Sequence, residues 1–140
     1  MNSRLTVPVQ ALRLAIGLTA TLAGLDKFFN ILADWGSYVS PVAAQLLPFS
    51  VGVLMAVVGV VEFAVGITIL MIAPRIGAYV ASAWLLLVAV NLALGGHFDV
   101  AVRDVVMSIA AFTLARFLEV QESAAVRPAA GGVLHRTVTA

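Results

Sequence analysis

The sequence predicts an all-α integral membrane protein in which four transmembrane helices form one bundle. Hydrophobic residues make up 62% of the 140 residues and charged residues 11%, and the mean hydropathy is +1.08. Soluble domains average roughly half apolar and about a quarter charged residues. A water-soluble fold could not cover this much apolar surface, and disordered chains are poor in apolar residues. The composition therefore indicates that the bilayer surrounds the chain.

Four stretches reach the roughly 20 apolar residues that a helix needs to cross a bilayer. They cover about residues 8–25, 49–73, 76–94 and 100–118. We expect residues 1–122 to form a single four-helix transmembrane domain and residues 123–140 to be a flexible tail. The first stretch could be misread as a cleaved signal peptide, but Arg13 inside it favours an uncleaved helix.

The distribution of basic residues predicts the orientation of the chain, because cytoplasmic ends of spans are enriched in Lys and Arg. With the N-terminus inside, the outer side holds only Lys27 and Arg103. The cytoplasmic side then holds Arg4, Arg13, Arg75, Arg116, Arg127 and Arg136. We therefore expect both termini to be cytoplasmic in the cell (inner) membrane.

The long connection between the first two spans carries apolar and aromatic residues at helical spacing. Trp35 and Tyr38 are of the types that favour the membrane–water boundary, while Asp26 and Asp34 occupy the other side of the pattern. This predicts an amphipathic helix over about residues 27–40, lying on the outer surface. A lid over the mouth of the bundle is a compatible alternative.

Polar residues lie on the predicted packing face of each span. Gly52, Gly59 and Gly66 recur every seven residues, and Glu62 lies on that same face. Small residues mark close helix contacts in membranes, so Glu62 should point at a neighbouring helix. Lys27, Asn91 and the Arg103-Asp104 pair belong to similar faces of the other spans. Costly ionisable groups normally face the interior, which predicts a polar pocket that opens toward the outer leaflet.

Each of these residues has a possible functional role and a structural alternative. We expect Glu62 and Asp104 to be the catalytic candidates, because a carboxyl group can exchange protons. The substrate-binding candidates are Lys27, Asn91, His97 and Arg103, and the structural polar residues are Arg13 and Asp99. Alternatively, Arg103 and Asp104 pair with Lys27 or Asp99 to hold the bundle together, and Glu62 is a protonated carboxyl group that hydrogen-bonds across a glycine contact. Asn91 then joins helices, and His97 is an ordinary loop residue.

Several function classes lack the residues that they need. Cysteine is absent, which excludes thiolate chemistry, disulfides and iron–sulfur ligation in this chain. Of the two histidines, His135 lies in the tail, so we expect no bis-histidine haem, and no cluster has metal-ligand spacing. A net charge of +1 with scattered basic residues gives no sign of a nucleic-acid partner.

The order of these motifs resembles the DoxX family of small four-helix membrane proteins. The first helix contains Arg13 and Gly17 and ends in Gly24-Leu25-Asp26-Lys27. The second contains Gly-x-x-Glu-x-x-x-Gly over residues 59–66, and the fourth begins with Arg103-Asp104 after a Gly-His-Phe-Asp turn. The similarity covers about residues 8–118. The resemblance implies a four-helix bundle. Less specifically, it implies a place in a membrane-associated oxidoreductase complex, because DoxX-like proteins are related to the DoxD subunit of thiosulfate:quinone oxidoreductase.

These observations lead to one main functional hypothesis and two alternatives. In the main hypothesis, the chain is a membrane subunit or anchor of an oxidoreductase assembly whose outer pocket binds a quinone or similar lipid-like head group. Its partners would be membrane lipid and other protein subunits, or further copies of itself. Alternatively, it is a non-catalytic accessory subunit that docks on a larger membrane complex. A small transporter is a weaker alternative, because four spans leave little room for alternating access.

Overall fold

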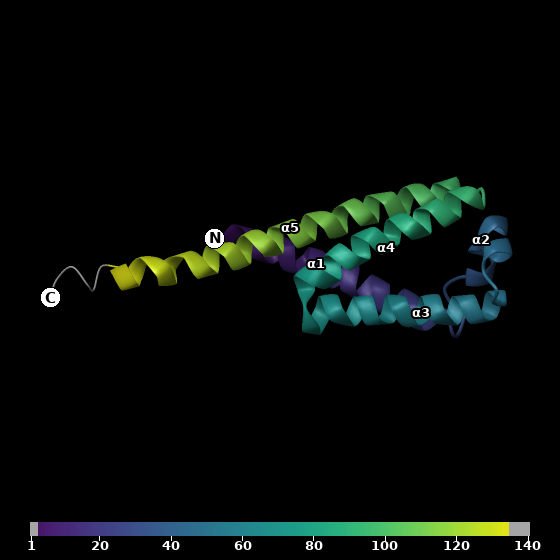
Figure 1. Ribbon diagram of the computed structural model, residues 1–140, viewed down its shortest axis with the longest axis horizontal. Helices are drawn as coiled ribbons and strands as arrows, with labels where there is room; N and C mark the ends of the chain where they lie inside the picture. The colour runs from purple at the N-terminus through teal and green to yellow at the C-terminus, as the bar shows by residue number, and fades with distance from the viewer. Residues whose placement is uncertain (1–2, 135–140) are drawn as a thin grey trace.

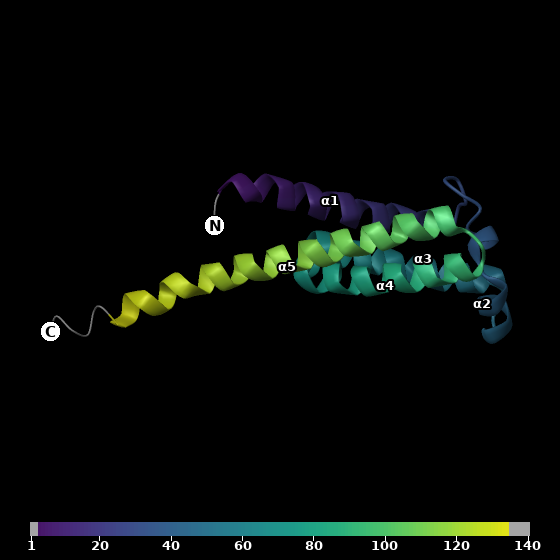
Figure 2. The same ribbon diagram turned by 90° about the horizontal axis from the view of Figure 1, so that it is seen from above.

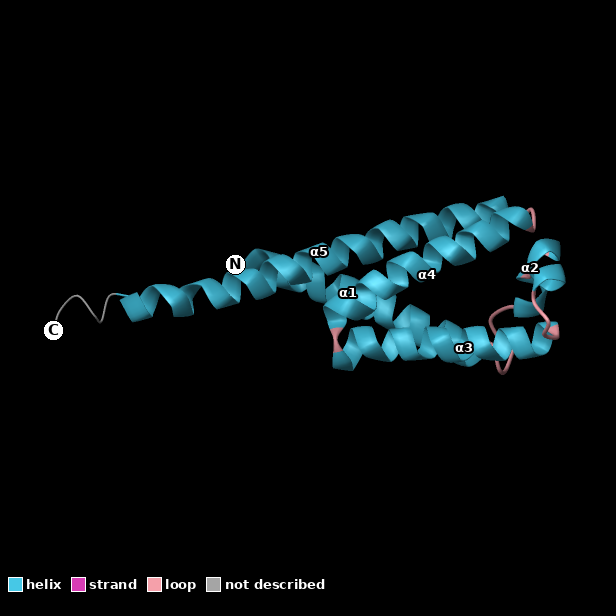
Figure 3. Ribbon diagram, viewed as in Figure 1, coloured by secondary structure: helices cyan, strands magenta, loops and turns pink. Residues whose placement is uncertain are grey.

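The described part of the chain is helical and contains no strand (Figure 3). The structure, a computed structural model, describes the backbone of residues 3–134 and the side chains of residues 5–125. Three helical segments are long and apolar enough to cross a membrane: Leu5–Asp26, Val51–Ile72 and Pro74–Leu94. The predicted multi-pass membrane character is therefore confirmed.

The long helices run back and forth and place the start of the first and the end of the last at the same end (Figure 1). Helix α1 covers Ser3–Asp26, α3 covers Val51–Ile67 and continues as the π-helix η2 (Thr68–Ile72), and α4 covers Pro74–Leu94. Helix α5 (Phe98–Leu134) lies along α4 and extends beyond the other helices (Figure 2). The 3-10 helix η1 (Trp35–Tyr38) and the short helix α2 (Pro41–Leu46) lie at the opposite end.

Helices α1 and α3 touch through glycines. A Cβ atom added to Gly59 would lie 2.8 Å from the carbonyl oxygen of Gly24, and one added to Gly66 would lie 2.8 Å from that of Gly17. Real side chains do not fit at such distances, so these helices meet backbone to backbone. The predicted glycine face is confirmed for Gly59 and Gly66, whereas a Cβ at Gly52 would meet nothing within 4 Å.

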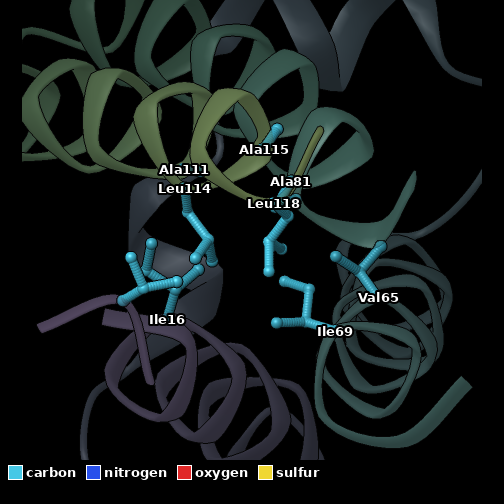
Figure 4. Close-up of a cluster of buried hydrophobic side chains, with 10 residues drawn as sticks. Ile16, Val65, Ile69, Ala81, Ala111, Leu114, Ala115 and Leu118 are labelled. Atoms are coloured by element: carbon cyan, nitrogen blue, oxygen red, sulfur yellow. The ribbon is translucent and has the colours of Figure 1, made fainter. Parts of the chain in front are cut away.

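A compact apolar cluster joins all four long helices near the end of α3 and the start of α4 (Figure 4). Ile69, Ala111, Leu114 and Ala115 are completely buried within it, and Ile16 contributes from α1. Three of the α5 positions in this cluster are Ala111, Leu114 and Ala115, which share one face of the helix because they are three or four residues apart. The alanines let α5 approach α4 closely, as small residues do in membranes.

Arg13 holds α1 against the end of α3. Its Nε donates to the carbonyl oxygen of Ile69 over 2.9 Å, and its Nη2 donates to the carbonyl oxygen of Leu70. Both carbonyls belong to η2, where the regular α-helical hydrogen-bond pattern has given way to the wider π pattern. Ile69 and Leu70 are among the last four residues of this helix, whose carbonyls lack intrahelical partners. Lipid offers no water to satisfy them, so the guanidinium fills a structural need there.

Replacing Arg13 with methionine should therefore destabilise the fold by about 2 kcal/mol, the usual value for hydrogen bonds to a charged donor. Unfolding in mixed detergent micelles, followed by far-UV circular dichroism, measures this. Arg75→Met is a matched control, because Arg75 makes only a half-exposed ion pair with Glu122 and exposed pairs contribute less than about 1 kcal/mol. Equal effects of the two substitutions would contradict the structural role of Arg13.

The predicted helix over residues 27–40 is wrong. Residues 27–34 form turns and irregular chain, and the only helical part of the range is η1. The Ser40-Pro41 pair begins α2 instead of ending a helix. The Ser40 hydroxyl accepts from the backbone N–H of Ala43 over 3.1 Å, and proline suits the first helical turn because it has no N–H to leave unpaired.

Helix α5 continues beyond the apolar stretch that was predicted to end near residue 118, and the predicted flexible tail from residue 123 is helical as far as Leu134. Two acidic residues just past the apolar stretch bind α4. Glu119 accepts from the hydroxyl of Tyr79 over 2.9 Å, and Glu122 pairs with Arg75 over 2.6 Å. The helix is therefore supported past the apolar stretch. The last six residues of the predicted tail lie outside the described range.

Candidate functional site

A cavity of about 550 Å³ lies between the helices on the side of α2. All four long helices and α2 contribute to its walls, which are mostly apolar. The polar candidates that the sequence predicted for a shared interior line this cavity together, namely Lys27, Glu62, Asn91, Arg103 and Asp104. Cavities of roughly 300–1,000 Å³ with apolar walls and a few polar groups are typical small-molecule sites.

The central polar feature is an ion pair between α1 and α3. Nζ of Lys27 lies 2.5 Å from Oε2 of Glu62, and the two side chains are only 5% and 14% exposed. The glycine contact explains this geometry, because Gly24 and Gly59 bring the backbones together one turn before each charged residue. The second oxygen of Glu62 has a longer contact of 3.5 Å with the indole N–H of Trp84.

Trp35 covers the lysine from the loop side. Nζ of Lys27 lies 3.8 Å from the centre of the Trp35 ring, a favourable arrangement of a cation over an aromatic face. Asp26 fixes this tryptophan, because its Oδ2 accepts from the indole N–H over 2.8 Å. The same carboxylate accepts from the backbone N–H groups of Ile31 and Leu32. Asp26 therefore organises the loop that follows α1.

Arg103 and Asp104 form a second pair, on α5. Their side chains are 3.1 Å apart, but the arginine is 64% exposed and the aspartate only 9%. One turn further along α5, the Ser108 hydroxyl donates to the carbonyl oxygen of Ser82 over 2.8 Å. The buried Asp104 carboxylate is thus turned toward the helices, while the guanidinium extends outward at the cavity's edge.

The remaining candidates hold the loop or lie away from the cavity. The Asn91 side chain donates to the carbonyl oxygen of Tyr38 and accepts from the backbone N–H of Ser40, so it ties α4 to the segment before α2. The His97 ring lies 3.2 Å from the carbonyl oxygen of Ser37 and packs against Tyr38. It is not part of the cavity wall. Asp99 is exposed in the first turn of α5.

The roles of Asp26, Trp35 and Trp84 were not predicted from the sequence. Asp26 and Trp35 were assigned to opposite sides of a helix that does not form. The available signal was an acidic residue next to Lys27 at a helix end, since a carboxylate there commonly accepts from the backbone N–H groups of a following turn.

The formal charges at the cavity cancel. Two cations, Lys27 and Arg103, accompany two carboxylates, Glu62 and Asp104, so a charged ligand gains no net attraction from them. Together they offer donors and acceptors to a neutral head group with carbonyl or hydroxyl oxygens. Among the described residues, no group of three His, Cys, Asp or Glu side chains could hold a metal ion.

Comparison of the chain with protein-family models, with curated proteins and with solved structures finds no match.

Proposed function

We propose that the chain is a four-span inner-membrane subunit of an oxidoreductase assembly and that its cavity binds a quinone head group near the outer leaflet. Both termini are cytoplasmic in this proposal, so the end with α2 is the outer one. The main support is the mostly apolar cavity of about 550 Å³ in which four charged side chains cancel. The resemblance to the DoxX family adds independent, weaker support.

The polar residues of the cavity have different roles in binding a quinone. A bound quinone brings its own redox chemistry, so the protein has to bind it, orient it and exchange protons with it. Lys27 and Arg103 donate hydrogen bonds to the carbonyl oxygens, and Trp84 offers a flat apolar face beside them. Glu62 and Asp104 are the carboxyl groups that can exchange protons at the site. A partner subunit with a redox cofactor supplies the electrons.

The substitution Glu62→Gln tests the proton role. Glutamine keeps an oxygen that can accept from Lys27, and the ammonium group keeps its position over the Trp35 ring, so the chain should fold and assemble. Glutamine cannot take up or release a proton. Quinone-linked electron transfer in native membranes should fall at least about a hundredfold, the lower range for loss of a positioned acid or base. A Glu62→Gln protein with normal activity would refute the proton role.

Purification from native membranes in mild detergent tests the assembly. Mass spectrometry should identify a co-purifying protein with a redox cofactor in a fixed ratio to this chain. A large complex without any redox subunit would favour the accessory role instead. A lone oligomer that carries only bulk phospholipid would favour transport or lipid handling.

A further inference from the structure

The cavity has a polar part and an apolar part. The polar part is formed by the two ion pairs described above. The apolar part lies between the halves of α3 and α4 that face α2, where its walls include Leu54, Met55 and Val58 on one side and Leu87, Val88 and Leu94 on the other. In Figure 1, α3 and α4 separate toward this end.

The apolar part reaches the lateral surface of the molecule. Leu87 and Leu94 line the cavity and are nevertheless 61% and 55% exposed. Both residues belong to the second half of α4, which separates from α3 (Figure 1). Packed side chains therefore do not seal the cavity along this part of α4, and in a membrane lipid tails surround the helix there.

The end of the cavity is covered by the chain between α1 and α3. Asp26 holds the first half of this segment through Ile31, Leu32 and Trp35. Asn91 holds the second half through Tyr38 and Ser40, and α2 continues across the opening with three of its residues in the cavity wall. A water-soluble molecule would have to displace this cover, whereas a membrane-dissolved one would not.

We infer that the ligand carries a long apolar chain and reaches the polar side chains sideways from the bilayer, between α3 and α4. This inference rests on the proposed binding of a quinone and names the part of the molecule that fills the rest of the cavity. The head group lies against Lys27 and Glu62, and the alkyl chain lies between Val58 and Val88 and leaves past Leu87.

The two tryptophans of the chain provide a direct test, because it contains only two and both Trp35 and Trp84 line the cavity. A bound quinone quenches tryptophan fluorescence. The purified full-length protein in detergent is titrated with a benzoquinone without a side chain and with the same benzoquinone carrying a decyl chain. Each quinone concentration is expressed as quinone per detergent micelle, because the quinones dissolve in the micelles. Every variant is measured at the same detergent concentration, so that it meets the same amount of dissolved quinone.

Val58→Phe narrows the apolar part, and Val57→Phe is its matched control. Val57 is the neighbouring residue on α3, is 54% exposed and is outside the cavity wall. Val58→Phe should weaken binding of the decyl quinone about tenfold, the affinity that a few buried methylene groups contribute. It should change binding of the tail-less quinone less than about twofold, and Val57→Phe should change neither. Val88→Phe, on the opposite wall, gives the same test if Val58→Phe does not fold.

The outcomes separate this inference from the proposed function. If the phenylalanine variant that folds weakens the binding of both quinones equally, or of neither, the alkyl chain does not lie between α3 and α4. The inference is then refuted, while the proposed quinone binding stands. If the wild-type protein is quenched by neither quinone, the proposed quinone site is refuted and the inference with it.

Discussion

Gly59→Ala should destabilise the protein by about 2–3 kcal/mol, whereas the same substitution at Gly52 should stabilise it slightly. The added methyl carbon of Gly59→Ala would lie 2.8 Å from the backbone oxygen of Gly24 and 3.1 Å from Cβ of Lys27. Backbone atoms cannot move aside unless α1 itself shifts, and overpacking of this kind typically costs about 1–3 kcal/mol. The shift would also separate Lys27 from Glu62.

Gly52→Ala is the matched control because both glycines lie in α3 and one lies in open space. Alanine is favoured over glycine within helices by about 0.5–1 kcal/mol, so this variant should unfold at the same or higher denaturant concentration than the wild type. Unfolding in mixed detergent micelles measures both. If the two substitutions changed stability in the same direction, the close contact of α1 and α3 would be wrong.

Lys27→Met should be the most damaging single substitution at the site and should lower the free energy of unfolding by roughly 3–5 kcal/mol. The substitution leaves the Glu62 carboxylate buried, with only the long contact to Trp84 near it. An unpaired buried charge costs more than a missing pair, because desolvation is no longer offset by attraction. The loss is measured in the same micellar unfolding experiment.

The double substitution Lys27→Met/Glu62→Leu should recover most of that stability, because it replaces the ion pair with apolar groups of similar size. A double variant as unstable as Lys27→Met alone would contradict the assigned pairing. If the double variant is stable, it shows whether the ion pair only stabilises the fold or also binds the ligand. A purely structural pair would leave ligand binding intact, whereas the proposed site would lose its ligand.

The sequence predicted the helical segments well because they follow from apolar length, and it placed Glu62 correctly because glycine spacing marks a helix face. Contacts between α1 and α3 at Gly59 and Gly66 bear out that face. Gly52 had the same spacing but lies beyond the contact, since spacing along one helix does not show how far its neighbour extends.

The loop after α1 could not be predicted from periodicity. Its apolar residues have helical spacing, but Asp26 binds the backbone N–H groups of Ile31 and Leu32 and so favours a turn over a helix. The extension of α5 was missed for a related reason. The apolar stretch ends near residue 118, but Glu119 and Glu122 just beyond it bind Tyr79 and Arg75 of α4, and such tertiary partners are not visible in the local pattern.

The quinone content of the purified protein shows whether the cavity between the helices is a quinone site. The wild type and the Lys27→Met/Glu62→Leu variant are purified from the same native membranes, and the quinone in each extract is measured by mass spectrometry relative to protein and phospholipid. The proposed site predicts close to one quinone per wild-type chain and, in the folded variant, only the proportion that bulk membrane lipid carries. If the wild-type protein also carries only that bulk proportion of quinone, the cavity is not a quinone site.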